Sequence, residues 1–427
     1  MNTDIKPYDA LIVVTPADMK RLRALHGRIA EYLPVRKLYF SGSAEVGEIL
    51  SKEKEKGIFS EEAALRVDFI NEDDILPFEE VRAVVTDVIH EYLNPGEKAP
   101  RGLCGWYYQQ FLKYSYAERC DDEFYLVWDG DTVPCGVFSM FSENGTPYLD
   151  YKQEYHEEYF NTMGKLIPGM RKIIKQSFIS EHMLFDTGKV KELCGKIEEN
   201  EAVPGKSYWE KILRCLTPEV LQGNSFSEFE TYGTFMALTD PMRYRLREWH
   251  SFRTAGFFLD KENLRENDIK WLGRDFFALS FEKDHALRSD TRGFFDNPEY
   301  QKKLSARKML EVVQGAFKSG SYRESWEGEG LTADEYPVFI MSSEDRKGEE
   351  IKLAEALIDR GENVITFHEG YGDYNSLDEF SARPLKAAVL MGTDAVFPGS
   401  VRIIRLDDVL ADAEAAAEKI ISETGLK

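Results

Sequence analysis

Short apolar runs alternate with segments of helical spacing along the first part of the chain. A continuous apolar run at residues 9–14 is followed by apolar positions at helical spacing over 18–32, and further short apolar runs lie at 37–40 and 67–70. Runs of this length, rich in β-branched and aromatic residues, are typical of strands. Strands that alternate with helices in this way predict an α/β fold.

A buried central strand is predicted at residues 123–128, and it ends in two carboxylates. Asp129 and Asp131 follow it directly, separated only by Gly130. Open α/β sheets bind ligands at the carboxyl ends of their strands, and carboxylate oxygens suit Mg²⁺ or Mn²⁺ carrying a diphosphate. The alternative is an acidic turn without a ligand, because pairs of this kind also recur by chance.

Four sequence blocks extend this pattern, in the order 105–113, 125–131, 180–183 and 227–233. Together they resemble an uncharacterised bacterial glycosyltransferase-like family that is related to the nucleotide-diphospho-sugar transferases of the GT-A fold. The resemblance implies a GT-A-like, Rossmann-like mixed sheet flanked by helices over residues 1–325. It also implies a nucleotide-diphospho-sugar donor, a (poly)saccharide or glycolipid acceptor, and Mn²⁺ or Mg²⁺ bound by Asp129 and Asp131.

A helix predicted at residues 106–119 carries candidates for the donor site. Its apolar stripe leaves Trp106, Gln109, Gln110 and Lys113 on or near another face. The lysine could neutralise a phosphate, and the glutamines could hydrogen-bond sugar hydroxyls. The alternative is an ordinary solvated helix face.

Two further donor-side candidates lie outside this helix. Arg101 supplies a cation just upstream of it. The resemblance places Thr15, in the loop after the first strand, near the nucleotide. An ordinary loop residue is the alternative for Thr15.

The segment that begins at Ser227 has both a structural and a catalytic interpretation. Ser227, followed three residues later by Glu230 before an apolar helical run, is the pattern of a capping box. On that interpretation Glu230 bonds back to the helix start, while Glu228 points outward. An inverting GT-A enzyme needs one carboxylate to take the proton of the acceptor hydroxyl, so Glu228 is the first candidate base and Glu230 the second.

Three more candidates lie on either side of this segment. His182 interrupts an apolar run in a block that borders the acceptor side in the related family, and His250 follows the aspartates as a late third metal ligand does in several GT-A enzymes. A packed core histidine is the alternative for both. Arg247 belongs to a cationic cluster with Arg243 and Arg245, which is either a clamp for a phosphate or acidic acceptor or charge balance against neighbouring carboxylates.

A second, smaller α/β domain is predicted at residues 337–427. Strands and helices follow one another there in the order of a small parallel sheet, after a linker at 326–336 in a stretch rich in Gly, Ser and Glu. No Gly-rich phosphate loop follows its first strand, so we assign no nucleotide site to it.

Composition narrows the class of protein. The chain has 427 residues, 43% of them hydrophobic, and can bury a full core, while a formal charge of −22 argues against general nucleic-acid binding. Five scattered cysteines without a Cys-x-x-Cys pair favour reduced thiols and a cytoplasmic location. No stretch approaches the ~20 apolar residues of a transmembrane helix, and no apolar signal core is expected at the N-terminus.

Two other functions stay open at this point. A nucleotidyltransferase shares strand-end carboxylates and this kind of sheet, although it usually has a Gly-rich first loop, and Thr15-Pro16-Ala17 is not one. A non-catalytic protein that binds nucleotide-sugars or carbohydrates is the other alternative. The sequence favours the glycosyltransferase over both.

Overall fold

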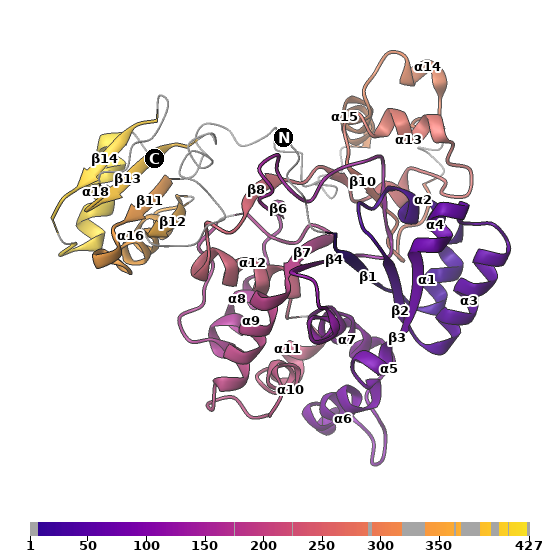
Figure 1. The fold of residues 1–427 in the computed structure, drawn as a ribbon, viewed down its shortest axis with the longest axis horizontal. Coiled ribbons are helices and arrows are strands. Elements are labelled where there is room, and N and C mark those ends of the chain that lie inside the picture. Colours follow the sequence, from indigo (N-terminus) through magenta and orange to yellow (C-terminus); the bar gives the residue numbers. More distant parts are fainter. Residues whose placement is uncertain are drawn as a thin grey trace.

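The computed structural model describes residues 7–174, 176–223, 225–288, 293–317, 338–362, 364–368, 385–393, 401–408 and 410–424. The linker predicted at 326–336 lies outside these residues. Figure 1 shows the arrangement of the helices and strands.

A five-stranded mixed sheet forms the centre of the molecule. Its strands are β1 (Asp9–Val13), β2 (Leu38–Gly42), β3 (Val67–Asn71), β4 (Phe124–Trp128) and β7 (His182–Asp186). Their order is β3-β2-β1-β4-β7; the first four are parallel, and β7 runs antiparallel to β4. The mixed sheet flanked by helices that the sequence predicts is therefore confirmed.

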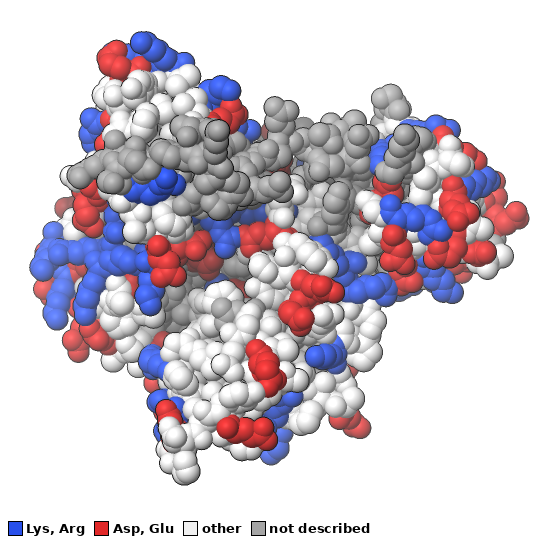
Figure 2. All heavy atoms as spheres, turned by 180° about the vertical axis from the view of Figure 1, so that it is seen from behind, with Lys and Arg blue, Asp and Glu red and all other residues white. Residues whose placement is uncertain are grey.

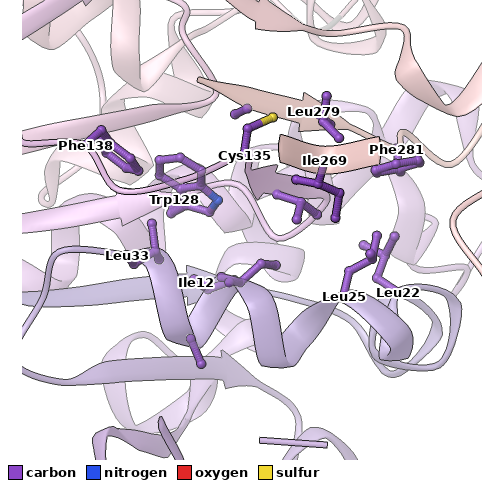
Figure 3. Close-up of a cluster of buried hydrophobic side chains, with 14 of the residues drawn as sticks. Ile12, Leu22, Leu25, Leu33, Trp128, Cys135, Phe138, Ile269, Leu279 and Phe281 are labelled. Carbon is purple, nitrogen blue, oxygen red and sulfur yellow. The ribbon is translucent and has the colours of Figure 1, made fainter. Parts of the chain in front are cut away.

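Both faces of this sheet are buried, which explains why its strands are continuous apolar runs. Ile12 and Trp128 face one core cluster together with Leu22, Leu25 and Leu279, as Figure 3 shows. The neighbouring strand residues, among them Leu11, Tyr125 and Val127, face a second cluster on the other side. Because strand side chains alternate in direction, one short segment supplies both cores.

Helices cover the two faces separately (Figure 1). The first face carries α1 (Pro16–Arg21), α2 (Arg23–Tyr32), α3 (Ala44–Glu55) and α4 (Glu61–Arg66). The second carries α6 (Phe78–Val88), α7 (Arg101–Ser115), α8 (Glu157–Leu166), α9 (Thr187–Glu199), α10 (Tyr208–Arg214), α11 (Pro218–Gln222) and α12 (Glu228–Thr239), with α5 (Glu72–Ile75) at its edge. The helix predicted at 18–32 is interrupted at Leu22, and the one predicted at 106–119 begins earlier, at Arg101.

Two smaller sheets accompany the five-stranded sheet. One has the order β5-β10-β9, formed by β5 (Thr132–Pro134), β10 (Ala278–Ser280) and β9 (Ser251–Phe252). The other pairs β6 (Tyr148–Tyr151) with β8 (Arg245–Glu248). Because β5 directly follows the two aspartates and pairs antiparallel with β10, the residues after β10 lie beside them. Further helices are α13 (Glu266–Leu272), α14 (Pro298–Gln301) and α15 (Ala306–Phe317).

A separate sheet forms near the C-terminus. Its strands β11 (Val338–Ser342), β12 (Val364–His368), β13 (Ala387–Met391) and β14 (Ile403–Leu406) are all parallel, in the order β12-β11-β13-β14. With α16 (Glu349–Ile358) and α18 (Ala413–Thr424) it encloses a core of its own. The small parallel α/β sheet is as predicted; the division of the chain at 326–336 stays a prediction.

The charge of the molecule is unevenly spread. In Figure 2, a group of Lys and Arg side chains lies at the left edge of the face shown, and elsewhere on this face Asp and Glu side chains alternate with Lys and Arg. Within the described part of the chain, no helix is long and apolar enough to cross a bilayer.

Candidate functional site

A cleft of about 920 Å³ opens at the carboxyl ends of β1 and β4. Val13 at the end of β1 and Val14 just after it line the cleft, as do Asp129, Gly130 and Asp131 in the turn after β4. Helices α7 and α12 form one wall, and the start of α8 and the segment after β10 contribute the others. The cleft therefore lies where an open α/β sheet binds ligands.

Seven of the residues predicted from the sequence line this cleft. They are Trp106, Gln109, Gln110, Lys113, Asp129, Asp131 and Glu228. The other six, Thr15, Arg101, His182, Glu230, Arg247 and His250, do not line it. The structure thus brings together the strand-end aspartates, the exposed face of α7 and the first residue of α12.

Lys113 holds two of these carboxylates at once. Its Nζ lies 2.7 Å from Asp129 Oδ1 and 2.5 Å from Glu228 Oε1, and its side chain is only 4% exposed. Burial alone would lower the pKa of Lys113, but Asp129 and Glu228 outweigh it and raise the pKa above its ordinary value. The lysine is therefore a buried ammonium that joins the two acids, in addition to any contact it makes with a ligand.

Glu228 is positioned by the start of α12. Ser227 is the N-cap, and its Oγ accepts a bond from the Glu230 N–H at 3.2 Å. The Glu228 N–H donates to Gln110 Oε1 at 2.9 Å, and the Glu228 side chain is 6% exposed. The prediction that Glu228 points outward is wrong, because it turns inward to Lys113. Burial raises the pKa of Glu228, Lys113 opposes that increase and Asp129 adds to it.

The capping box forms only in part. The Glu230 carboxylate does not return to its own helix start but accepts bonds from Ser177 Oγ at 2.6 Å and the Phe178 N–H at 3.1 Å. Lys172 Nζ lies 3.3 Å from its other oxygen. The prediction of a reciprocal bond from Glu230 is therefore wrong, because tertiary contacts use the whole carboxylate.

Asp131 lies in acidic surroundings. Burial, together with the charges of Asp129 and Glu282, raises the pKa of Asp131 to about 7, against an opposing contribution from Arg21. The turn that carries it requires Gly130, since a Cβ there would lie 2.4 Å from Val14 Cγ1. Because the turn lies so close to β1, the positions of Asp129 and Asp131 depend on a glycine between them.

These residues fit a hard divalent cation in part. Asp129 and Asp131 offer oxygen donors, and burial together with the charges of Asp129 and Glu282 disfavours the ionised form of Asp131, which a bound cation would stabilise. Mg²⁺ is commonly bound by one or two carboxylates together with phosphate oxygens. Among the described residues, no group of three or more His, Cys, Asp and Glu side chains is arranged to hold a metal ion, so a third protein ligand is not provided.

His250 is not brought to the aspartates. Its Nε2 lies 3.9 Å from Glu248, and burial together with the nearby cations Arg307 and Lys152 lowers its pKa to about 4. Surroundings that disfavour an imidazolium also disfavour a metal cation. The surroundings of His250 therefore do not favour it as a metal ligand.

His182 and Arg247 form a core network around Asp150. His182 Nε2 lies 2.8 Å from Asp150 Oδ2, and Arg247 Nε donates to Asp150 Oδ1 at 2.6 Å. The His182 side chain is fully buried and packs between Trp128 and Trp249. These contacts agree with the alternative interpretations, in which His182 is a packed core histidine and Arg247 balances the charge of a neighbouring carboxylate.

Thr15 and Arg101 also have structural partners. Thr15 caps α1, where its Oγ1 accepts a bond from the Asp18 N–H at 3.2 Å. Arg101 lies 3.0 Å from Glu72 and places its guanidinium over the Phe78 ring.

The glutamines of α7 have different roles. Gln110 uses both ends of its amide, accepting from Glu228 and donating to the Trp106 carbonyl at 3.1 Å. Gln109 lines the cleft, and the buried Trp106 Nε1 has no hydrogen-bond partner among the described residues. Gln109 is thus the polar group of this face that a ligand in the cleft could use, whereas the Trp106 N–H is buried.

Sequence reasoning missed several cleft residues. Glu181 and Arg253 line it, as do Arg21 and the acidic residues Glu282 and Asp284 after β10. Glu181 belongs to the block at 180–183, in which the sequence indicates His182 as the candidate instead. Glu282 follows a short apolar strand, as Asp129 does, and this was the signal available for it.

Residues 52–313 match the sequence profile of DUF6492, a family of unknown function, and the chain belongs to this family. No curated protein matches the chain. Among solved structures, it is similar to the apo form of the glycosyltransferase GlyE of Streptococcus pneumoniae TIGR4, with 11% identity, 98% of each chain covered and a TM-score of 0.31. It is also similar to the galactosyltransferase LgtC in complex with donor and acceptor sugar analogs, with 10% identity, 75% of this chain and 99% of that chain covered, and a TM-score of 0.31.

Proposed function

We propose that this protein is a metal-dependent glycosyltransferase that moves a sugar from a nucleotide-diphospho-sugar to a (poly)saccharide or glycolipid acceptor. The observation that carries the proposal is the contact of Lys113 with both Asp129 and Glu228 in one cleft. It connects a cation-binding group at a strand end with a buried carboxylate at a helix start. An inverting transfer needs both a cation that stabilises the leaving diphosphate and a basic group that takes the acceptor proton.

The donor would occupy the side of the cleft beside the aspartates. Asp129 and Asp131 would hold Mn²⁺ or Mg²⁺, which when bound neutralises the donor diphosphate. Gln109 would orient the donor by hydrogen bonds, since it lines the cleft. Lys113 keeps its positive charge beside Asp129 and adds to the electrostatic stabilisation of the leaving diphosphate.

Glu228 would take the proton of the acceptor hydroxyl. As the acceptor oxygen bonds to the anomeric carbon, the bond from that carbon to the diphosphate breaks, and the hydroxyl proton passes to the carboxylate. A base works best when its pKa lies near the working pH, and burial raises the pKa of Glu228 in that direction. Lys113 then remains paired with Asp129, so protonation of Glu228 leaves no unpaired buried charge.

A cytoplasmic location agrees with the thiols. All five cysteines are free, as expected for a chain in a reducing compartment.

A thermal-shift screen of nucleotide-sugars with and without Mn²⁺ tests the proposed function. A donor at about 100-fold excess over its Kd would stabilise the fold by about 2.7 kcal/mol, and we expect this only with the metal present. Stabilisation by nucleoside triphosphates alone would favour the nucleotidyltransferase instead. The absence of any metal-dependent stabilisation would contradict the proposal.

A further inference from the structure

Two glutamates in the first turn of α12 approach Asp129 by different routes. Glu228 reaches the Asp129 carboxylate through Lys113. Glu230, two residues farther along, turns away from the cleft and binds the segment Ser177–Glu181. This segment leads to the backbone of Asp129.

Glu230 fixes the beginning of the segment. One oxygen of its carboxylate accepts both the Ser177 hydroxyl at 2.6 Å and the Phe178 N–H at 3.1 Å. The Glu230 side chain is only 2% exposed, so water cannot readily replace these bonds. Hydrogen bonds to a buried charged group are among the stronger ones in proteins.

Close packing holds the helix against the same segment. A Cβ at Gly233, one turn after Glu230, would lie 2.2 Å from Cγ of Phe178. The absence of a side chain at Gly233 therefore lets the Phe178 ring contact the α12 backbone. Glu230 and Gly233 therefore have structural roles in the block at 227–233 that are separate from the proposed base at Glu228.

The segment ends at Glu181, whose backbone is unusual. Its φ of 61° makes it the one non-glycine residue with a positive φ in the described part of the chain. Such a conformation persists only where surrounding contacts enforce it. Its carboxylate is held by Lys152 and by Ser251 Oγ at 3.1 Å, and its carbonyl accepts the Asp129 N–H at 2.8 Å.

We propose that Glu230 is a positioning residue of this cleft: it holds Ser177–Glu181 so that the Glu181 carbonyl fixes the Asp129 backbone and thereby the direction of the Asp129 carboxylate. The functional consequence rests on the proposed function, because it concerns the group that would bind the donor metal. The structural consequence, an ordered Asp129 N–H, does not depend on it.

Hydrogen exchange of the full-length protein tests the structural consequence. In Glu230→Ala, we expect the peptides that contain Asp129 and residues 177–181 to exchange about tenfold faster or more. Glu230→Gln retains an oxygen that can accept both bonds and should protect these peptides nearly as well as the parent. Ser177→Ala, which removes one donor only, should have an intermediate effect and serves if Glu230→Ala does not fold.

Tyr232→Phe is the matched control. It removes the acceptor of the Asp186 N–H, a 2.9 Å bond from the same helix to the far end of β7. A loss of stability without faster exchange at Asp129 is the expected result for this variant. Equal exchange at Asp129 in Glu230→Ala and the parent, or equal acceleration in Tyr232→Phe, would overturn the proposal.

Calorimetry with UDP or GDP and Mn²⁺ tests the functional consequence. Glu230→Ala should bind about tenfold more weakly than the parent, with Glu230→Gln within about threefold of it. Were Glu230 the base instead, Glu230→Gln would bind the diphosphate normally but lose transfer. A parent that binds neither diphosphate would contradict the proposed function, while the exchange comparison would still decide the role of Glu230.

Discussion

Lys113 and Glu228 form a buried ion pair 2.5 Å long between α7 and α12. The two residues are 115 positions apart in sequence and meet at one wall of the cleft. Lys113 also lies 4.3 Å from the centre of the Phe229 ring, a favourable position for a cation over an aromatic face. Burying such a pair costs desolvation free energy, so the intact pair stabilises the fold little. Removing only one partner, however, leaves a buried charge unpaired and destabilises the fold strongly.

Lys113→Met should be strongly destabilising. It leaves Glu228 without its cation in a buried position, and breaking one side of such a pair costs about 3–5 kcal/mol. Lys20→Met is the control, because the exposed Lys20–Glu45 pair at 2.8 Å is worth about 0–1 kcal/mol. Urea unfolding of both variants measures the difference, and equal losses would show that the buried pair is unimportant.

Asp131 should make stability depend on pH. Its folded pKa of about 7 lies above the unfolded value of about 3.9, so the folded protein holds this proton more tightly. The resulting stabilisation is fully present below about pH 4 and is lost as the pH rises through about 7. Asp131→Asn should remove this part of the pH slope, as measured by denaturant unfolding at pH 5 and pH 8.

The same group should link metal binding to protons. A cation competes with the proton on Asp131, so Mn²⁺-dependent diphosphate affinity should rise with pH up to about 7. Calorimetry in buffers of different ionisation enthalpy would detect the released proton. Asp129→Asn with Asp131→Asn should abolish the binding, and unchanged affinity in that double variant would exclude the pair as the metal site.

The sequence predicted the parts of the site that depend on local pattern. Asp129 and Asp131 were placed at a strand end because an apolar run stops there, and Gln109 and Lys113 share a helix face because of helical spacing. The partners of these residues were not predictable in the same way. Lys113 was expected to face a phosphate, but its carboxylate partners come from other elements that packing brings close.

Long-range strand pairing explains why the sequence did not predict Glu282 as a neighbour of Asp131. The residues after β10 lie beside Asp131 because β10 pairs with β5 across 148 positions, for example Ser280 with Thr132. No local signal specifies that pairing, so Glu282 could not be connected with Asp131 from the sequence. For the same reason Glu230 matched a capping pattern while its side chain bonded to Ser177.

Gly130→Ala should disturb the aspartates by a steric route. The new methyl would lie 2.4 Å from Val14 Cγ1, so either β1 or the turn must move. We expect a loss of stability of about 1–3 kcal/mol and weaker metal-dependent binding. Val14→Ala in the same chain should restore much of both, whereas Gly136→Ala, which has open space, should change neither.

The C-terminal sheet should be separable from the cleft. One face of it encloses a core of its own, the other packs in a small apolar cluster with Met242 and Leu246, and none of its described residues lines the cleft. A chain that ends at residue 325 is therefore expected to fold and to bind the donor, as circular dichroism and calorimetry would show. An aggregated or donor-blind truncation would mean that residues 337–427 complete the first domain.

Glu228→Gln is the most direct test of the proposed mechanism. The amide keeps the size of the side chain and an oxygen that can accept the Lys113 bond, but it cannot take a proton. Turnover should fall by about 10²–10⁴-fold while donor affinity changes little, because the donor would contact the aspartates rather than Glu228. Donor Kd, kcat and melting temperature should be measured with a donor identified in the thermal-shift screen, with Glu230→Gln alongside. Parental turnover in Glu228→Gln would remove this residue from the mechanism, and a stable but inactive Glu230→Gln would transfer the role of the base to Glu230. If both variants kept full activity, a retaining reaction would be favoured, in which the leaving diphosphate itself takes the acceptor proton and the Lys113–Glu228 pair serves only to hold Asp129.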